Sequence, residues 1–501
     1  MQGQSHPGIG EVLSPQDLEG CPMGVSQTPT ELTSAKKSAW ERLHAYLEER
    51  GRAVKPVPDL EVFERELHQL FAAAEAEAVG EELERFDLDL SEVMIDGVSH
   101  RRVLRCEQAY MTASGPVSVT RSLYSTRQEG ARAVCPLELR AGVVEGFWTP
   151  LAARQATWTV AHLTPQEGEE MFALLGGMSP SRSILDRLPK ELSERWEAER
   201  IAFESTLRAV ERVPKAAVSV AVSLDGVMVP MKDGKRREKR ERAAAEEKHL
   251  RGPFGHQEVG CGTLTFYDRY GERLRTIRVA RMPESGKENL KRMLLEELTA
   301  VLRERPELRL VKIADGARDN WTFLGKDLPR GREVVDFYHA AEHLHAALAA
   351  AYGETSVKCK VQFEKLRHVL RYDPKGAAKV VRALVYLRDC HPRSKKITKE
   401  LKYFRRNRHR MRYARLARMK LPIGSGVTEA ACKTLVTQRM KRSGMRWRHA
   451  GGQAILTLRG WAQSERFDRG WALLAWTYKK VVELPNKVTP LPKRREVAAS
   501  E

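Results

Sequence analysis

The sequence predicts an α/β core in which helices cover a mixed five-stranded sheet. An all-helical insertion interrupts this core, and helical and small β regions precede it. Two observations predict the core. Short apolar runs, typical of strands buried on both faces, occur between residues 213 and 345, and most of them end in an acidic residue or are directly followed by one. The runs lie at 216–224, 259–268, 273–282, 308–314 and 332–338.

The order of these strands and of the helical segments between them is informative. Three strands come first, followed by a helix across 287–303, a strand, a helix and a final strand. This is the order of the ribonuclease-H-like fold. We therefore expect the first part of such a core at 213–345, a basic helical insertion at 346–420, and the C-terminal helical part of the core at 421–478.

The flanking regions differ from the core in composition and periodicity. Residues 1–33 are rich in Gly, Pro, Ser and Gln, which predicts a disordered leader. Apolar residues three and four positions apart predict a helical region at 34–95. Alternating stretches broken by Ser-Gly-Pro predict a hairpin or small sheet within 96–135. Residues 136–212 return to a helical pattern, and the Pro- and charge-rich end, 479–501, is expected to be a flexible tail.

The helical region 136–212 contains a candidate DNA-reading element. The segment EMFALLGGMSPSRSILDRLPKEL predicts a helix, a Gly-Gly-Met turn, and a second helix capped by Ser179 or Ser181. That is the shape of a helix-turn-helix, whose second helix would present Arg182 and Arg187 to DNA. An ordinary helical hairpin has the same pattern, so both interpretations remain open.

The charge balance points to a polyanionic partner. The chain of 501 residues has 86 Lys+Arg against 66 Asp+Glu, which gives a net charge of +20 and a pI near 9.7. Between His391 and Lys420, thirteen Lys and Arg residues accompany a single acid, Glu400. Because so many unbalanced cations repel one another unless an anion is near, this segment favours contact with a phosphate backbone.

Other features argue against several classes of protein. No run approaches the ~18 apolar residues of a membrane span, and the N-terminus has neither a basic start nor an apolar stretch of a secretory signal. The seven cysteines are scattered without a C-x-x-C pair, which argues against a disulfide framework or a Cys-based zinc site. A reducing, cytoplasmic setting fits best.

Two aspartates follow buried strands and are candidates for metal chemistry. Asp225 follows the run at 216–224, and Asp315 follows the run at 308–314. Enzymes that cut DNA with two cations about 4 Å apart use carboxylates as ligands, and the carboxyl ends of strands are where an open sheet gathers them. A strand-end Asp also commonly caps the next turn, and Asp319 and Asp336 compete with Asp315 on chemistry alone.

Glu429 is the best third acid. It is expected in the first turn of a long helix, after a Gly-Ser-Gly that allows a tight approach and a Ser425 that can cap. Six basic residues and no acid follow between Lys433 and Arg448. A surface pair between Glu429 and Lys433 at i,i+4 spacing explains the same residues without any metal.

Several stretches together resemble the bacterial insertion-sequence transposases of the ISKra type. These are CPLELRAGVVEGFWTP, VSLDGVMVP, KIADGARDNW, VVDFYHAAEHL and IGSGVTEAACKTLVTQRMKRSGMRW, in order from about residue 100 to 460. The resemblance implies that Asp225, Asp315 and Glu429 are a DDE triad that holds two Mg²⁺ or Mn²⁺ ions. It also implies binding to the terminal inverted repeats of the element, DNA cleavage and strand transfer, and a homodimer or higher oligomer on DNA.

The pair Asp336-x-x-His339 also resembles a signature of Mutator-like and hAT-like transposases, which implies an ancillary role near the site.

The long separation between Asp315 and Glu429 fits a family with a helical insertion before the last segment of the core. In this interpretation the basic end of the insertion is a clamp on the DNA backbone. Tyr403, Phe404 and Tyr413 either stack on unpaired bases or lie in a core.

The residues expected to contact DNA have basic or aromatic side chains, and they lie in the second helix of the helix-turn-helix, in the basic end of the insertion and in the segment after Glu429. They are Arg182, Arg187, Arg405, Arg406, Arg408, Arg410, Arg412, Lys433, Arg439, Lys441, Arg442, Arg446 and Trp447. The basic loop 231–251 is expected to be a solvated excursion between the first two strands, and a contact with target DNA there remains open.

Two alternative functions remain. The first is an inactive or domesticated relative that binds DNA as a regulator. The second is a zinc metallopeptidase, because His339-Ala-Ala-Glu342-His343 spells H-x-x-E-H. On a helix the two histidines would share a face and could bind zinc, with Glu342 as the general base. No third ligand is evident in the sequence, and this reading leaves the strand-end aspartates unexplained.

Overall fold

The computed structural model describes residues 38–484, except 129, 233–241, 244 and 247–254. The predicted leader, most of the basic loop 231–251 and the tail beyond Leu484 lie outside the described residues. Contacts divide the chain into two units, Met1–Lys55 and Pro56–Glu501. In the first unit, α1 (Ala39–Arg52) starts with a reciprocal capping box, because the Ser38 hydroxyl accepts from the Glu41 amide and the Glu41 carboxylate accepts from the Ser38 amide.

The second unit begins with a helix on a small antiparallel sheet. Helix α2 (Leu60–Glu84) packs on β3 (Gly115–Ser125), which pairs with β2 (Val98–Thr112). The next strand is β1 (Glu92–Ile95). The predicted hairpin is therefore confirmed, and its turn is Ala113-Ser114, directly before Gly115 and Pro116 at the start of β3.

The start of the C-terminal tail differs from the prediction of a flexible segment. Val482–Glu483 form β9, which pairs antiparallel with β1, so the sheet order is β3-β2-β1-β9. Two residues of strand surrounded by Pro, Lys and Glu have no periodicity that sequence analysis could recognise. The backbone hydrogen bonds of the β1 edge hold this segment in place.

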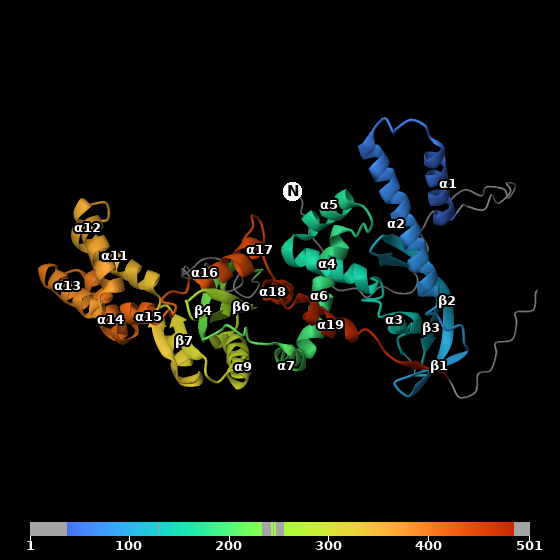
Figure 1. The fold of residues 1–501 in the computed structure, drawn as a ribbon. Helices are drawn as coiled ribbons and strands as arrows, with labels where there is room; N and C mark the ends of the chain where they lie inside the picture. Colours follow the sequence, from blue (N-terminus) through green and yellow to red (C-terminus); the bar gives the residue numbers. More distant parts are fainter. Residues whose placement is uncertain (1–37, 129, 233–241, 244, 247–254, 485–501) are drawn as a thin grey trace, which may run out of the picture. The chain divides into compact units, whose positions relative to one another are not determined.

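Five helices follow, and they bear out the helical pattern. They are α3 (Pro136–Ala141), α4 (Pro150–His162), α5 (Pro165–Leu175), α6 (Arg182–Ala198) and α7 (Arg200–Val210) (Figure 1). Between α5 and α6, Gly176 and Gly177 take φ values of 75° and 84°, which favour glycine. Ser181 is the N-cap residue of α6, so the second helix begins where the sequence predicts.

The mixed sheet of the core has five strands in the order β6-β5-β4-β7-β8 (Figure 1). Strand β4 pairs antiparallel with β5, and β5 with β6, whereas β4, β7 and β8 are mutually parallel. The strands are β4 (Ser219–Pro230), β5 (His256–Tyr267), β6 (Arg273–Arg281), β7 (Arg309–Ala314) and β8 (Arg332–Val335). All five predicted strands are present.

Helices cover both faces of this sheet. On one face α9 (Glu288–Glu304) lies very close to β5, because a Cβ at Gly260 or Gly262 would be 2.7 Å from Leu290 or Leu294. On the other face Val259 and Cys261 pack with Leu435, Val436 and Leu456. The residues of β5 thus alternate between the two helical layers, as its buried apolar pattern requires.

The helices of that second layer come from the C-terminal part of the core. They are α16 (Gly426–Ala431), a π-helical turn (Cys432–Thr437), α17 (Gln438–Met440) and α18 (His449–Gln463), whereas α19 (Phe467–Trp476) packs against α4, α6 and α7. Helix α18 docks on the edge strand β6, where Gln453 Oε1 accepts from the Met282 amide at 3.0 Å. Ser464 Oγ likewise accepts from the Arg278 amide at 2.8 Å, so side chains satisfy part of this sheet edge.

The segment between β8 and α16 is mostly helical. The predicted insertion, 346–420, begins inside α11 (Phe337–Tyr352) and contains α12 (Val357–Tyr372), α13 (Gly376–Cys390), α14 (Lys395–Asn407) and α15 (Tyr413–Arg418). The two ends of the whole segment meet, because the Phe337 amide donates to the Ile423 carbonyl at 3.0 Å. No helix that the structure describes is both long and apolar enough to cross a membrane.

Candidate active site

Asp225 and Asp315 lie at the same level of two adjacent parallel strands. The parallel ladder between β4 and β7 ends at the pair Ser223 and Ile313, and each aspartate is two residues further along its strand. The prediction that the first strand ends at Asp225 is wrong, because β4 continues to Pro230 through its pairing with β5, where Asp225 faces Cys261. Asp225 is instead the point where β4 has lost its parallel neighbour.

Asp225 is in an environment that disfavours its negative charge. Its Oδ1 accepts from the Gly226 amide at 2.7 Å, and its Oδ2 is 4.0 Å from the Cys432 sulfur. Burial raises the pKa of Asp225, and the nearby Asp315 carboxylate raises it further. A cation bound between the two carboxylates would relieve this repulsion.

The segment after β7 fixes Asp315 from one side. Both hydrogen bonds that described residues make to its carboxylate reach Oδ1, from the Ala317 amide at 3.0 Å and from Asn320 Nδ2 at 3.2 Å. The indole of Trp321 donates to the Asp315 carbonyl at 2.6 Å. Asp315 therefore also caps the following turn, which is the other role that the sequence allows for this residue.

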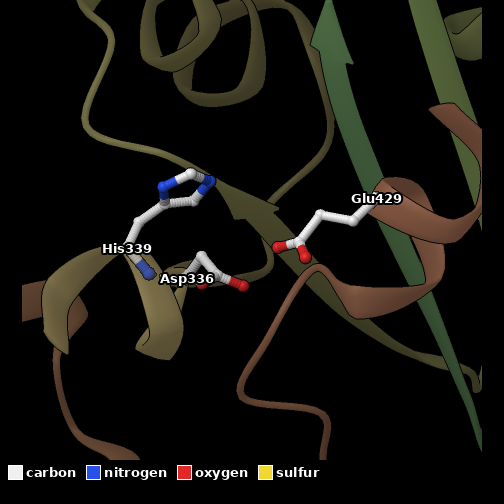
Figure 2. A group of neighbouring side chains, drawn as sticks. All are labelled: Asp336, His339 and Glu429. Carbon is white, nitrogen blue, oxygen red and sulfur yellow. Dashed lines mark hydrogen bonds between the residues drawn. The ribbon is translucent and has the colours of Figure 1, made fainter. Parts of the chain in front are cut away.

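Glu429 lies next to Asp336 and His339, as Figure 2 shows. Each of the three residues offers one ligand atom, and these atoms all lie within 4.8 Å of one another. Asp336 and His339 come from the start of α11, whereas Glu429 is in the first turn of α16. Among the described residues this is the group with metal-ligand spacing, and it includes neither Asp225 nor Asp315.

Asp336 is completely buried and holds two segments together. Its Oδ1 accepts from the His339 amide at 2.8 Å, which caps α11. Its Oδ2 accepts from the hydroxyl of Ser425 at 2.8 Å and also from the Ser425 amide. Gly424 permits this approach, because a Cβ there would be 3.2 Å from Asp336 Oδ2. Three donors of the chain thus surround this carboxylate.

Ser425 has a role that the sequence did not reveal. It is the N-cap residue of α16, as predicted, but its hydroxyl makes no capping hydrogen bond. The hydroxyl is instead 2.8 Å from Asp336 Oδ2 and 3.3 Å from Glu429 Oε1, so it bridges the two acids. No ion pair joins Glu429 to Lys433 among the described residues, so the surface-pair explanation of Glu429 is not what the structure contains.

His339 is surrounded by negative charge. Burial by itself lowers the pKa of His339, but nearby carboxylates outweigh it and raise the pKa above the usual value. These carboxylates are Asp336, Glu342, Asp315 and Glu429. All four carboxylates are therefore close enough to His339 to stabilise its protonated form. A metal ligand must be neutral imidazole, so a cation at His339 would displace a proton.

The H-x-x-E-H motif does not assemble as a zinc site. The Nδ1 of His343 is 2.6 Å from Glu400 Oε2, on α14, and the His343 ring stacks on Tyr403 with a centroid distance of 3.7 Å. The Nδ1 of His339 is 3.2 Å from Glu342 Oε2. The two histidines therefore have different partners, and His343 is outside the ligand group found in the described part of the chain.

Most of the predicted DNA-binding cations are on the surface. The exposed ones are Arg182, Arg187, Arg405, Arg406, Arg408, Arg412, Lys433, Lys441 and Arg446. Their exposure is compatible with phosphate contact and does not by itself establish it. Arg187 also forms an ion pair with Glu191 at 3.2 Å.

The other predicted DNA-binding residues have partners inside the protein. Arg439 is 2% exposed, and burial lowers its pKa to about 10. Arg410 pairs with Glu333 at 2.7 Å and lies 3.9 Å over the Trp321 ring. Arg442 pairs with Glu167 at 2.5 Å. Trp447 donates its indole N–H to the Met440 carbonyl at 2.9 Å. The structure therefore gives Arg439 a place in the core, which is a correction to its expected surface role.

The three aromatic residues of the insertion are core residues. Phe404 is fully buried, and Tyr413 and Tyr403 are 1% and 8% exposed. The alternative in which these rings stack on unpaired bases is thus not compatible with this arrangement. The helical spacing that puts basic residues on one face of α14 puts Tyr403 and Phe404 on the other, and Tyr413 is buried at the start of α15.

Replacing Ser425 by Ala is expected to weaken the apparent affinity of this group of side chains for Mg²⁺ or Mn²⁺ by about 10- to 100-fold, because residues that orient metal ligands have effects of that size. The variant removes one hydroxyl donor from Asp336 and Glu429 and leaves the backbone unchanged. The apparent affinity for Mg²⁺ or Mn²⁺ in an activity titration is the measurement. Ser443→Ala, at an exposed serine, is the matched control, and equal behaviour of the two variants would contradict the bridging role.

Comparisons with known proteins add little to this geometry. No protein-family model matches the chain, and no curated protein matches it. One solved structure with some similarity is the Drosophila P element transposase strand transfer complex. The alignment covers 65% of this chain and 80% of that chain at 11% identity, with a TM-score of 0.23. A TM-score this low carries no argument about fold or function.

Proposed function

We propose that this chain is a DDE transposase that binds the ends of its own element and catalyses metal-dependent DNA cleavage and strand transfer. The observation that carries the proposal is the position of three acids. Asp225 and Asp315 extend from adjacent parallel strands. Cys432, three residues after Glu429, is 4.0 Å from Asp225, whereas Glu429 itself lies beside Asp336 and His339, and these contacts support a common site.

The topology of the core supports this proposal. A sheet of order β6-β5-β4-β7-β8, with an antiparallel β4–β5–β6 meander and parallel β4, β7 and β8, fits a ribonuclease-H-like core. In such an open sheet, ligands gather at the carboxyl ends of the parallel strands. The sequence resemblance to ISKra-type transposases assigns the same three acids independently of the geometry.

The residues present fit a pair of hard divalent cations. Asp225, Asp315 and Glu429 would hold them, since carboxylate oxygens are the ligands that Mg²⁺ and Mn²⁺ prefer. Burial and the nearby Asp315 carboxylate raise the pKa of Asp225, and a bound cation would relieve the repulsion between the two carboxylates. Two such ions, when bound, activate the attacking oxygen and stabilise the leaving oxygen of a phosphodiester.

Asp336 and Ser425 act as positioning residues in this proposal. Asp336 is fully buried and already accepts three hydrogen bonds from the chain, so its charge is compensated without a cation. Through Ser425 it sets the start of α16 and therefore the direction of Glu429. His339 is close enough to add a ligand or to hold a phosphate oxygen, and the carboxylates around it keep it protonated to higher pH than a free histidine.

The surface cations have a separate task. The exposed residues of α14 and of the segment after Glu429, for example Arg405, Arg406 and Lys433, would neutralise DNA phosphates on either side of the acids. No side-chain nucleophile is needed, because the chain's contribution is to orient the strand and to neutralise charge. Handling two DNA ends together requires two or more copies on DNA.

The test uses a plasmid that carries the gene together with its natural flanking DNA. Purified full-length protein supplied with Mg²⁺ or Mn²⁺ should cut this plasmid at the boundaries of the element. A plasmid of equal length without the flanking DNA is the control. Absence of cuts at the boundaries with either metal would count against a transposase. The alternative would then be a protein that binds DNA without cutting it, for which the exposed arginines of α6 are sufficient.

Removal of the metal is expected to abolish cleavage without releasing the DNA. Chelation with EDTA should stop the reaction, and excess Mg²⁺ or Mn²⁺ should restore it, because ligation by carboxylates is reversible. Gel-shift measurements in EDTA and in Ca²⁺ check whether the DNA stays bound. Cleavage that persists after exhaustive chelation would contradict the metal-dependent mechanism, and restoration by Zn²⁺ alone would point back to the histidines.

A further inference from the structure

A cavity of about 760 Å³ lies between the carboxylate site and the helical insertion. Its walls are the turn after β7, with Asp315 and Gly316, one side of α11, with His339 and His343, and the segment from Pro392 to Arg406. The volume is within the range of roughly 300–1,000 Å³ that is typical of small-ligand sites. Because Asp315 and His339 line it, a ligand in the cavity would adjoin the proposed cleavage site.

The lining of the cavity is strongly basic. Five cations contribute to it, whereas its acids are Asp315 and Glu400. The cations are Arg393, Lys395, Lys399, Lys402 and Arg406. Glu400 is 1% exposed and is engaged by His343, so it does not offset them fully. No ion pair to Lys395, Lys399 or Lys402 occurs among the described residues. These lysines face a cavity without a compensating acid, which is the electrostatic character of a phosphate site.

A buried hydroxyl provides a second, independent indication. Tyr403 lines the cavity and is 8% exposed, yet its hydroxyl has no hydrogen-bond partner among the residues described. Burial raises the pKa of Tyr403, so this hydroxyl stays protonated and remains a donor. Buried polar groups are normally hydrogen-bonded, and an orphaned one calls for an unobserved partner.

The position of Tyr403 is fixed by its neighbours. Its ring stacks on His343, and a Cβ at Gly316 would be 2.1 Å from Tyr403 Cε2. The absence of a side chain at Gly316 therefore lets the ring lie against the turn that carries Asp315. Arg406 closes the same corner by donating from Nη2 to the Gly316 carbonyl at 2.9 Å. A fixed donor and exposed cations in one concave site match an acceptor-rich anion.

We propose that this cavity binds a single unpaired nucleotide, with its phosphate on the α14 cations and an acceptor oxygen on the Tyr403 hydroxyl. A duplex presents its phosphates on a convex surface, whereas this site is concave and of nucleotide size. In the context of the proposed function, on which this assignment of the strand rests, the nucleotide belongs to the DNA strand that passes the carboxylates. A free nucleotide has the same chemistry and is the other possible source.

The experiment measures binding in Ca²⁺, so that it does not depend on cleavage. The probes are a 30-base-pair duplex with blunt ends and the same duplex with one unpaired 2-aminopurine nucleotide at a 3′ end. The full-length chain should bind the second probe about tenfold more tightly and change its 2-aminopurine fluorescence. Tyr403→Phe, which removes only the hydroxyl, should reduce that preference about five- to tenfold. Lys399→Ala should reduce it similarly and lower its salt dependence.

Controls separate the pocket from general effects of charge and folding. Lys365→Ala removes an exposed cation of α12 that does not line the cavity, and it should keep the preference. Thermal melting checks folding, and Tyr403→Phe should not lower the melting temperature, because the hydroxyl that it removes has no partner. A purely structural role for Tyr403 would instead lower stability and leave the preference between the two probes unchanged.

Thymidine 5′-monophosphate and 5′-triphosphate, titrated by calorimetry, provide the second arm. Binding of either one, lost in Tyr403→Phe and Lys399→Ala, supports the nucleotide site with a free nucleotide as its source. A preference for the unpaired probe without such binding supports the strand. Equal binding of both duplexes together with no nucleotide binding would overturn the proposal. If the cavity passes these tests but the protein does not cut the plasmid, the nucleotide-binding site is supported and the transposase function is refuted.

Discussion

Replacing Asp225 by Asn is expected to lower metal-dependent DNA cleavage at least about 10³-fold while DNA binding is retained. A metal ion contributes several kcal/mol of transition-state stabilisation, and each 1.36 kcal/mol corresponds to about a factor of ten in rate. Asn keeps the size of the side chain and can still accept from the Gly226 amide, but it removes the charge. Single-turnover cleavage of the flanking-DNA plasmid and a gel shift in Ca²⁺ are the measurements.

The same variant should be at least as stable as the parent at neutral pH. Burial and Asp315 raise the pKa of Asp225, so folding favours its protonated form. The parent therefore loses stability as the pH rises through the pKa of Asp225, and Asp225→Asn lacks this loss. The expected gain is about 0.5–2 kcal/mol at pH 7. Asp268→Asn, at an acid far along the chain from the site, is the control for cleavage, and equal loss in both variants would contradict the assignment of Asp225.

Replacing Arg466 by Ala is expected to destabilise the protein by about 3–5 kcal/mol. Arg466 is 6% exposed, and its guanidinium contacts two buried carboxylates, those of Glu297 at 2.7 Å and of Glu211. Without Arg466, the buried carboxylates of Glu211 and Glu297 lose the cation that they share. Leaving buried charges without their partner is strongly destabilising. Denaturant unfolding of the full chain, followed by fluorescence, measures the loss. Arg469→Ala is the control, because Arg469 is 38% exposed at its side chain and pairs with Glu211 at 3.3 Å, so it should cost less than about 1 kcal/mol.

The pH dependence gives this second prediction a separate check. Burial opposes the charge of Glu211, but the hydrogen bond from Arg466 and the neighbouring arginines outweigh burial and lower its pKa. A lowered pKa contributes stability that is present at neutral pH and lost as the pH falls through it. The difference between the parent and Arg466→Ala should therefore be largest near pH 7 and shrink on acidification. A difference that grows toward acid pH would contradict this account of the network.

The strands and the helical insertion were predictable because their patterns are local. A run such as 308–314 carries enough apolar residues to identify a buried strand, and the amphipathic spacing of α14 identifies a helix with a buried face. Strand β9 was not predictable, because its two residues owe their conformation to pairing with β1. The continuation of β4 beyond Asp225 has the same cause, since β5 supplies the hydrogen bonds.

The candidate site could be predicted only in part, for a related reason. Strand-end acids drew attention to Asp225 and Asp315, but no spacing rule places Glu429 beside Asp336 and His339, which are distant in sequence. Likewise, a basic residue in a basic segment looks like a surface residue. Arg439 is nevertheless 2% exposed, because the π-helical turn and α17 direct it inward. Contacts between residues that are far apart in the sequence determine the positions of Glu429 and Arg439.

The closure of the insertion at its base has a mechanical consequence. The segment that carries the insertion begins after Asp336 and ends before Ser425, and these two residues are hydrogen-bonded to each other, beside the Phe337–Ile423 backbone contact. Helices α14 and α15 also contact the core directly, since Arg406 donates to the Gly316 carbonyl and Tyr413 donates to the Val335 carbonyl. A force on these helices would therefore reach the turn that carries Asp315 as well as Ser425, which contacts Glu429.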